Sequence, residues 1–328
     1  MFDISVIVAA KLLRYGNTGG SEMPLIAYRK QNVTAKKLQL ISIAQGIVQE
    51  YAAQGFDMTL RQLYYQLVAR GFIANHQREY KRLGDAIDTA RMNGLIDWGS
   101  IVDRTRGCLM NDHWDSPAEI VEDAAGAYKI DLWKGQRRRV EVWIEKEALI
   151  GVISGLCRKW DVPYMACRGY LSQSEMWRSS QRIIRYLRKG QPTIILHLGD
   201  HDPSGIDMTA DIKRRLQIFV GHEFENTDTG DPYEVPVLRL GLNMDQVQQY
   251  NPPPNPAKMN DARAAAYIAQ YGHSCWELDA LDPQTLTGLV ESNIRGIVDL
   301  DKWNARLRKQ KKQQGEIKEV AGLFRKGK

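Results

Sequence analysis

The sequence has no apolar run close to the roughly 18 residues that a membrane-spanning helix needs. Its first residues, MFDISVIVAAKLL, carry an Asp and no Lys or Arg before a short apolar stretch, which is unlike a secretory signal. The sequence also has no GxxxxGK(S/T) phosphate loop and no GxGxxG turn, so neither ATP nor a dinucleotide is indicated as a ligand. These absences predict a cytoplasmic protein that does not span a membrane.

Cysteine is scarce. The four cysteines among 328 residues lie far apart without a CxxC pair, so neither a zinc site nor a disulfide framework is predicted, and we expect reduced, mostly buried thiols. The 27 glycines and 12 prolines are ordinary numbers, which excludes a collagen-like or globally disordered chain. A hydrophobic fraction of 43% allows a substantial core, and the length predicts two domains with appendages.

Excess charge is confined to the C-terminus. The 45 Lys and Arg and the 39 Asp and Glu give the chain a net charge of +6. Residues 301–328 hold ten basic and three acidic residues, a surplus of seven, so the rest of the chain sums to −1. Any basic surface on the globular part must therefore be local.

The N-terminal third predicts a small helical domain. Residues 1–35 are weakly patterned and are interpreted as an extension. AKKLQLISIAQGIVQEYAAQG has apolar residues at helical spacing, and TLRQ is a capping box in which Thr59 begins a second helix and Gln62 reaches back. A third pattern, YKRLGDAIDTARMNGLI, ends at Gly94. Three helices followed by a short extended segment favour a helix-turn-helix or winged-helix domain over 36–106.

From about residue 137, strands alternate with helices. RRVEVWIE, PYMAC, TIILHLGD and VPVLRLGL are predicted strands, separated by amphipathic segments that are predicted helices. This order predicts a doubly wound α/β domain over about 137–242, whose ligands bind at the carboxyl ends of the strands. The expected fold class is therefore α/β plus α, with a helical C-terminal extension after the proline-rich connector at 251–256.

Three carboxylates follow two of these strands. Glu145 closes VEVWI, and Asp200 and Asp202 close TIILHLG within GDHDPSG. Acids that converge at one sheet edge form an oxygen-rich site suited to Mg²⁺, and they need a cation because like charges repel.

Three other interpretations of these acids stay open. Glu147 competes with Glu145 for the position at the end of the first strand. The acids could also be solvated turn residues. Alternatively, DHDPSGIDMTAD could be a calcium loop with acids at its positions 1, 3 and 12, although Pro203 lies inside it and its last position is Asp211 rather than Glu.

The helix that begins at Thr59 carries two adjacent tyrosines on different faces. Tyr64 shares a face with leucines and is predicted to lie in the core, whereas Tyr65 lies one turn beyond Arg61 on a neighbouring face. A guanidinium beside a phenol can bind a phosphate under attack and favour the phenolate, which an unperturbed pKa of about 10 otherwise disfavours. The alternative is that both tyrosines simply pack.

Several of these segments together carry a resemblance. A strand ending in IEKEAL, the segment CRGYLSQ and a strand ending in GDHDPSG resemble a Toprim domain. They are similar to the family that unites the A-type, DNA-cleaving chain of DNA topoisomerase VI with the meiotic double-strand-break protein, whose patterns are EKxA, KGYP and DxDPxG. RLGLNMDQVQQYN, WELDAL and the RxxYY pattern in TLRQLYYQLVARG extend the similarity to about 55–295, and the chain most resembles the short stand-alone Mini-A members.

The resemblance implies a chemistry and a domain division. It implies that Tyr65 attacks a DNA phosphodiester beside Arg61, that Asp200 and Asp202 hold Mg²⁺, and that Glu145 holds the metal or moves a proton. Combined with the patterns above, it divides the chain into the extension 1–35, a winged-helix domain 36–106 with the catalytic tyrosine, a linker 107–136, a Toprim domain 137–295 with a family-specific C-terminal part, and a basic helical tail 296–328 that is peculiar to this chain.

The resemblance also implies partners. These are double-stranded DNA, a second copy of the chain in a homodimer that pairs the tyrosine of one protomer with the acids of the other, and a separate ATPase subunit of the B type for strand passage. A DNA-cleaving protein of this kind would associate with the nucleoid in the cytoplasm.

Basic residues suggest where DNA lies. On the predicted helix 173–189, a basic face opposite an apolar face favours contact with a phosphate backbone, although a solvated charged face is an equal alternative. That basic face consists of Arg178, Arg182, Arg185 and Lys189. Residues 137–139, all Arg, and the basic tail are further candidates. His197 and His201 receive no role, and we expect His201 to face solvent.

Three functions are consistent with these patterns. The first is DNA cleavage by tyrosine transesterification. The second is a Toprim nuclease in which metal-activated water hydrolyses DNA and Tyr65 is structural. The third is a non-catalytic winged-helix DNA-binding protein of a plasmid or phage.

Overall fold

The structure is a computed structural model that describes residues 25–29, 31–102, 111–224, 234–257 and 261–326. Most of the predicted N-terminal extension lies outside these residues, as does Cys108, while Cys157, Cys167 and Cys275 are buried as expected. In the described residues, none of the helices combines the length and the apolar character that crossing a membrane requires.

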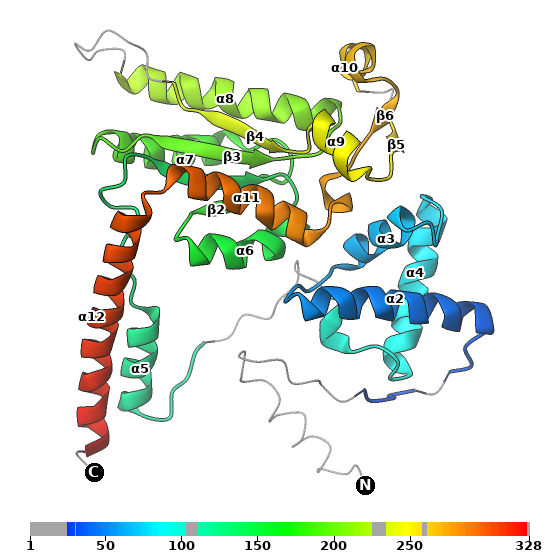
Figure 1. The fold of residues 1–328 in the computed structure, drawn as a ribbon, viewed down its shortest axis with the longest axis horizontal. Coiled ribbons are helices and arrows are strands. Elements are labelled where there is room, and N and C mark those ends of the chain that lie inside the picture. Colours follow the sequence, from blue (N-terminus) through cyan, green and yellow to red (C-terminus); the bar gives the residue numbers. More distant parts are fainter. Residues whose placement is uncertain (1–24, 30, 103–110, 225–233, 258–260, 327–328) are drawn as a thin grey trace.

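A helical unit comes first (Figure 1). Helix α2 spans Ala35–Ala53, α3 spans Leu60–Ala69 and α4 spans Gln77–Met92. The predicted capping box at the start of α3 is present, with the Thr59 hydroxyl accepting a hydrogen bond from the Gln62 backbone amide. The three helices enclose a core of aliphatic and tyrosine side chains. Beta pairing in the described part of this unit is limited to isolated bridges, such as Met58 with Ile101.

The second unit is built on a four-stranded parallel sheet in the order β2-β1-β3-β4. The strands are β1 (Arg139–Ile144), β2 (Tyr164–Ala166), β3 (Thr193–Leu198) and β4 (Val237–Gly241). Every residue of β1 and β3 is buried, as expected for the two central strands of a sheet that is covered on both faces.

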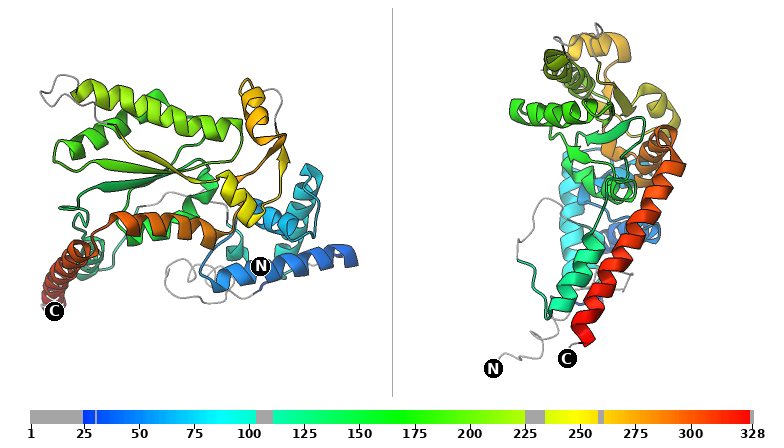
Figure 2. Two further views of the ribbon diagram at one scale, coloured as in Figure 1. Left: turned by 45° about the horizontal axis from the view of Figure 1, so that its top comes forward. Right: turned by 90° about the vertical axis from the view of Figure 1, so that its left-hand side faces the viewer.

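Helices cover both faces of this sheet (Figures 1 and 2). On one face, α6 (Ile150–Lys159) and α11 (Pro283–Ile297) pack in one cluster with the alternate strand residues Val142 and Leu196. On the other, α7 (Gln173–Leu187) and α8 (Pro203–Phe224) pack with Trp143 and Ile195. The predicted doubly wound α/β arrangement beside a helical unit is confirmed at this level.

Short elements after β4 connect the sheet edge to the helical unit. They are α9 (Met244–Tyr250), β5 (Asn255–Pro256), α10 (Ala264–Tyr271) and β6 (Ser274–Cys275), with β5 and β6 antiparallel. The Asn75 amide of the helical unit donates to the Pro254 carbonyl at 3.1 Å and to Asn255 Oδ1 at 2.7 Å. The turn Leu278–Ala280 packs against α3. The two units therefore contact one another at the carboxyl edge of the sheet.

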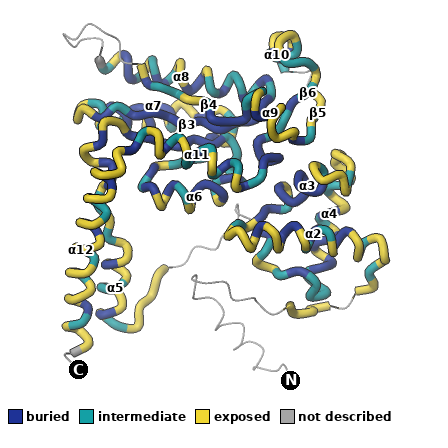
Figure 3. Tube along the Cα trace, in the orientation of Figure 1, coloured by how far each residue is buried: buried dark blue, intermediate teal, exposed yellow. Residues whose placement is uncertain are grey.

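Two helices outside this body form a projection that we call the arm. Helix α5 (Pro117–Ala127) comes from the predicted linker, and α12 (Leu300–Lys326) comes from the predicted tail. They lie side by side in all three ribbon views (Figures 1 and 2). Figure 3 shows that buried residues concentrate in the sheet and its flanking helices, whereas the arm is mostly exposed or intermediate.

Candidate active site

Glu145 and Asp200 meet at the carboxyl edge of the sheet because they follow adjacent parallel strands, β1 and β3. The Asp200 backbone amide donates to Glu145 Oε2 at 2.9 Å. The turn after β3 is tight, since a Cβ at Gly205 would lie 2.2 Å from the Asp200 carbonyl oxygen. A glycine is therefore required there. Glu147 does not compete for this place, because its carboxylate pairs with Arg168.

Asp202 caps the helix that follows. Its Oδ1 accepts from the Gly205 backbone amide at 2.6 Å and from the Ser204 hydroxyl at 3.0 Å. The calcium-loop interpretation is wrong, because Pro203 begins helix α8 instead of lying in a loop. Asp211, which would have been the last ligand, lies on α8 and pairs with Arg215 at 3.1 Å.

A buried lysine neutralises Asp200. Lys146 Nζ lies 2.9 Å from Asp200 Oδ2 and 3.0 Å from Asp279 Oδ1, and it also pairs with Glu277. Asp200 is 6% exposed, and its other oxygen accepts from the Leu278 amide at 2.7 Å. Burial raises the pKa of Asp200 above its ordinary value, against the opposing effect of Lys146. Burial alone would lower the pKa of Lys146. The surrounding acids outweigh this effect and raise that pKa above its ordinary value, so the ammonium stays charged.

Arg61 extends this network to the helical unit. Its Nη2 lies 2.9 Å from Glu277 Oε2 and its Nε lies 2.7 Å from Asp279 Oδ2, while about half of the side chain remains exposed. We call Arg61, Lys146, Asp200, Glu277 and Asp279 the charge cluster. Despite burial, Lys146 and Arg61 hold the pKa of Glu277 below its ordinary value, so this carboxylate is ionised. The cluster is a continuous ionic connection from α3 to the end of β3.

Tyr65 lies beside the charge cluster. Its ring centroid is 5.7 Å from the Arg61 guanidinium carbon, and its side chain hydrogen-bonds that of Asn255. The residue is 5% exposed. Burial, followed by the charges of Glu277 and Asp279, raises the pKa of Tyr65, so the phenol is protonated in this arrangement. The tyrosine thus lies next to acids of its own chain.

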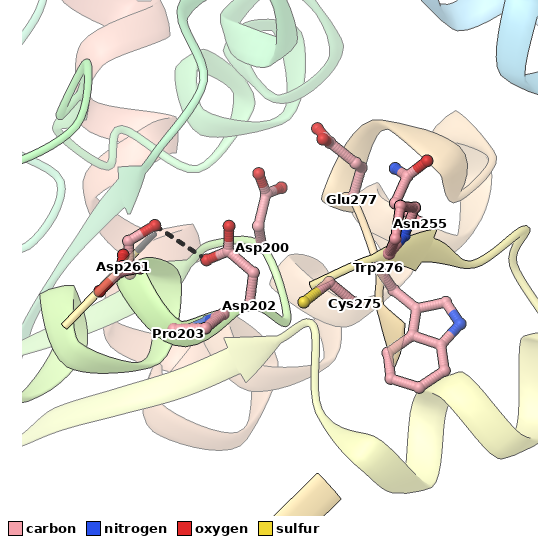
Figure 4. Close-up of a pocket in the computed structure, with 10 residues that line it drawn as sticks. Asp200, Asp202, Pro203, Asn255, Asp261, Cys275, Trp276 and Glu277 are labelled. Carbon is pink, nitrogen blue, oxygen red and sulfur yellow. Dashed lines mark hydrogen bonds between the residues drawn. The ribbon is translucent and has the colours of Figure 1, made fainter. Parts of the chain in front are cut away.

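A small cavity opens between the strand ends and the β5–β6 segment (Figure 4). Its volume is about 50 Å³, and its lining includes the carboxylates of Asp200, Asp202, Asp261 and Glu277. This space admits water or a small cation but not an organic substrate. A large substrate would have to approach from the outside.

The predicted metal ligands do not form a metal site as they are placed. Among the residues that the structure describes, no group of three or more His, Cys, Asp or Glu side chains is positioned to hold an ion. Asp200 gives one oxygen to Lys146 and the other to a backbone amide, and Asp202 is occupied as a helix cap. Mg²⁺ binding therefore stays a prediction.

The predicted basic face on α7 is only partly free. Arg182 pairs with the buried Glu141 at 2.7 Å, and Arg178 lies 3.5 Å from Glu175. Arg185 and Lys189 are exposed. Of the three consecutive arginines at 137–139, Arg139 at the start of β1 is buried, with its guanidinium carbon 3.9 Å from the Tyr186 ring centroid, while the preceding two are exposed.

The expectation for His201 is wrong. This residue is 2% exposed, and its Nδ1 lies 2.7 Å from the Tyr267 hydroxyl, among the rings of Tyr271 and Trp276. The segment that contains Tyr267 folds over the turn and covers it. His197 is also buried, and its Nδ1 lies 2.9 Å from Thr209 Oγ1.

The burial of His197 predicts a pH effect on stability. Burial, with a smaller contribution from Arg239, lowers the pKa of His197 to about 3, so below about pH 6.5 only the unfolded chain takes up this proton. Stability should then fall with decreasing pH by up to about 1.4 kcal/mol per pH unit from this group. Urea titrations between pH 6.5 and 4.5 measure how the free energy of unfolding depends on pH. In the His197→Asn protein this dependence should be shallower, by the amount that corresponds to the uptake of about one proton on unfolding. Equal slopes in both proteins would contradict this assignment.

Sequence reasoning did not select several residues that build the site. Lys146, Glu277 and Asp279 lie within the segments IEKEAL and WELDAL, so their positions were visible although their roles were not. Arg239, on β4, donates to the carbonyls of Gly199 and Asp200 at 3.1 and 2.6 Å and holds the turn after β3. No local pattern indicated this arginine.

The chain matches none of the models of known protein families, and no similar sequence is found among curated proteins. Its function must therefore be inferred from the chemistry of the site together with the sequence motifs.

Proposed function

We propose that this protein cleaves double-stranded DNA by tyrosine transesterification, as a Toprim protein similar to the A-type, DNA-cleaving chain of DNA topoisomerase VI. The observation that carries the proposal is the charge cluster, which joins the helix of Tyr65 to the carboxylate edge of the parallel sheet. The parallel α/β sheet beside a helical unit agrees with the proposal at the level of fold class, while the Toprim and winged-helix assignments are taken from the sequence motifs.

In the proposed reaction, Tyr65 Oη attacks a backbone phosphorus and the bond from phosphorus to a deoxyribose oxygen breaks. The DNA phosphate becomes linked to the tyrosine, and the leaving oxygen receives, through water, the proton that the tyrosine gives up and becomes a free hydroxyl. Arg61 is half exposed and lies beside the ring, so it is placed to bind the attacked phosphate. Glu277 and Asp279 interact with the phenol and are the carboxylates that would accept its proton.

The reaction requires a change at the contact between the units. Tyr65 is 5% exposed and protonated in the arrangement described. DNA must therefore displace the side chains of Asn255 and Glu277 before a phosphate can reach Tyr65 Oη. A phosphate that binds Arg61 would compete with Glu277 for the guanidinium. DNA itself thereby opens the site in this proposal.

The test uses supercoiled plasmid incubated with the protein and Mg²⁺, quenched with detergent and run with and without protease. Protein-linked breaks, released only by protease, are the expected product. An EDTA arm tests the predicted need for Mg²⁺, with Glu145, Asp200 and Asp202 as its ligands. The absence of breaks under every condition would favour a non-catalytic DNA-binding protein.

A Toprim nuclease is the second candidate, and one observation favours it. The burial and raised pKa of Tyr65 are those of a packed, structural tyrosine, whereas a nucleophile must first be exposed and deprotonated. In that case water attacks the phosphorus, and the broken ends carry no protein. Free ends in the plasmid assay would select this candidate.

The contacts also predict how the site is assembled. Arg61 and Tyr65 contact acids of their own chain, whereas the family resemblance implies a homodimer with the site shared between protomers. A mixture of Tyr65→Phe and Asp200→Ala proteins should stay inactive if each site forms within one chain, because neither chain is complete. Recovery of about a quarter or more of wild-type cleavage in the mixture would show a shared site. A B-type ATPase subunit remains the proposed partner for strand passage.

A further inference from the structure

The arm carries a surface that the cleavage site does not use. Helix α12 has 27 residues, which gives it a length of about 40 Å, and it projects away from the sheet beside α5 (Figures 1 and 2). The C-terminal segment also holds the whole positive surplus of the chain. Its orientation therefore decides where that charge is displayed.

Specific contacts with α5 and the segment after it fix this orientation. Gln310 Oε1 accepts from the Ile130 amide at 3.0 Å, and Gln314 Nε2 donates to the Tyr128 carbonyl at 2.9 Å. Nearer the tip, Arg325 pairs with Glu122 at 2.7 Å. One side of α12 is thus committed to α5, and the opposite side must face outward.

The outward side carries a group of cations that we call the outer basic cluster. It consists of Arg308, Lys309, Lys311 and Lys312, on either side of the buried Gln310. Within the described residues, none of the four forms an ion pair. Four uncompensated positive charges therefore lie within about one and a half turns of helix.

We propose that the outer basic cluster binds the phosphate backbone of duplex DNA, away from the break. This inference takes the identity of the partner from the proposed function. Since the rest of the chain sums to −1, the C-terminal segment 301–328 is its main attraction for a polyanion. The other basic candidates are weaker, because Arg182 on α7 is committed to Glu141 and Arg139 is buried, which leaves only two exposed arginines before β1. A lipid surface fits less well, because the large exposed apolar side chains of α12 lie toward its two ends, at least two turns from the cluster. These are Leu300, Val320, Leu323 and Phe324.

The experiment measures duplex affinity against salt concentration by fluorescence anisotropy, with the full chain carrying Tyr65→Phe so that no DNA is cut. Changing all four cluster residues to Gln should reduce the slope of log K against log salt by about 3 to 4, because each phosphate contact contributes about 0.9. The matched control changes four exposed cations that already pair with carboxylates. These are Lys159, Arg188, Lys213 and Arg214.

The control should keep the slope, and so should a charge-preserving variant with Arg at all four cluster positions. An unchanged slope in the Gln variant, or an equal loss in the control, would overturn the proposal. A Gln variant that loses anionic-vesicle binding but not DNA binding would also overturn it. The plasmid assay reports separately on the proposed function: tight, arm-dependent binding without cleavage would refute the cleavage proposal and leave the arm proposal standing.

Discussion

Replacing Tyr65 with Phe is expected to abolish protein-linked DNA breaks, with a loss of at least about a thousandfold in the plasmid assay. The change removes only the attacking oxygen. The ring keeps its packing: its centroid stays 5.3 Å from that of Tyr64 in an edge-to-face contact, and it keeps its position beside Arg61. DNA affinity should therefore stay close to that of the wild type.

Tyr64→Phe is the matched control, because the neighbouring tyrosine has the same chemistry in a structural setting. Its hydroxyl donates to Asn75 Oδ1 at 3.0 Å and to the His76 carbonyl at 3.2 Å. Loss of these bonds should cost about 1 kcal/mol of stability and leave cleavage intact. Protein-linked breaks that survive Tyr65→Phe, or disappear only with Tyr64→Phe, would show that Tyr65 is not the nucleophile.

Replacing Lys146 with Met is expected to reduce the free energy of unfolding by about 3–5 kcal/mol, the usual cost of leaving buried charges without their partner. Lys146 is the shared cation of Asp200, Glu277 and Asp279, and the Asp279 side chain is only 1% exposed. Without the ammonium, these carboxylates repel one another or take up protons. Chemical denaturation at pH 7 measures the loss.

Lys159→Met provides the comparison for this prediction. Lys159 is 59% exposed and pairs with Glu291 at 3.2 Å, so its removal should cost less than about 1 kcal/mol. Adding Asp200→Asn to Lys146→Met should recover part of the lost stability, because it removes one of the buried carboxylates that no longer has a cation beside it. Equal effects of the two lysine changes would mean that the Lys146 ammonium does not stabilise the buried carboxylates around it.

Local patterns predicted the elements of the fold well. Alternating strands and amphipathic helices indicated the doubly wound sheet, and the capping box located the start of α3 at Thr59. The meeting of Glu145 with Asp200 also followed, because the ends of adjacent parallel strands share an edge. These features depend on the short-range spacing of apolar residues and on the rule that adjacent parallel strands end at the same edge of the sheet.

Contacts between distant segments were not predictable in the same way. Arg61 and Glu277 are separated by 216 positions, and His201 is covered by Tyr267, 66 positions later. A polar residue in a turn is normally exposed, so the burial of His201 had no local signal. Helix α5 was missed because most of its contacts are with α12, near the other end of the chain. Tertiary packing decided all three.

The most direct test of the central claim is to identify the residue that carries DNA. The quenched complex is digested with nuclease and trypsin, and the peptide Gln62–Arg70, which lies between the cleavage sites at Arg61 and Arg70, is fragmented by mass spectrometry. The account predicts a nucleotide linked through phosphate to Tyr65 and an unmodified Tyr64. Broken plasmid whose ends carry no protein, with this peptide entirely unmodified, would contradict it.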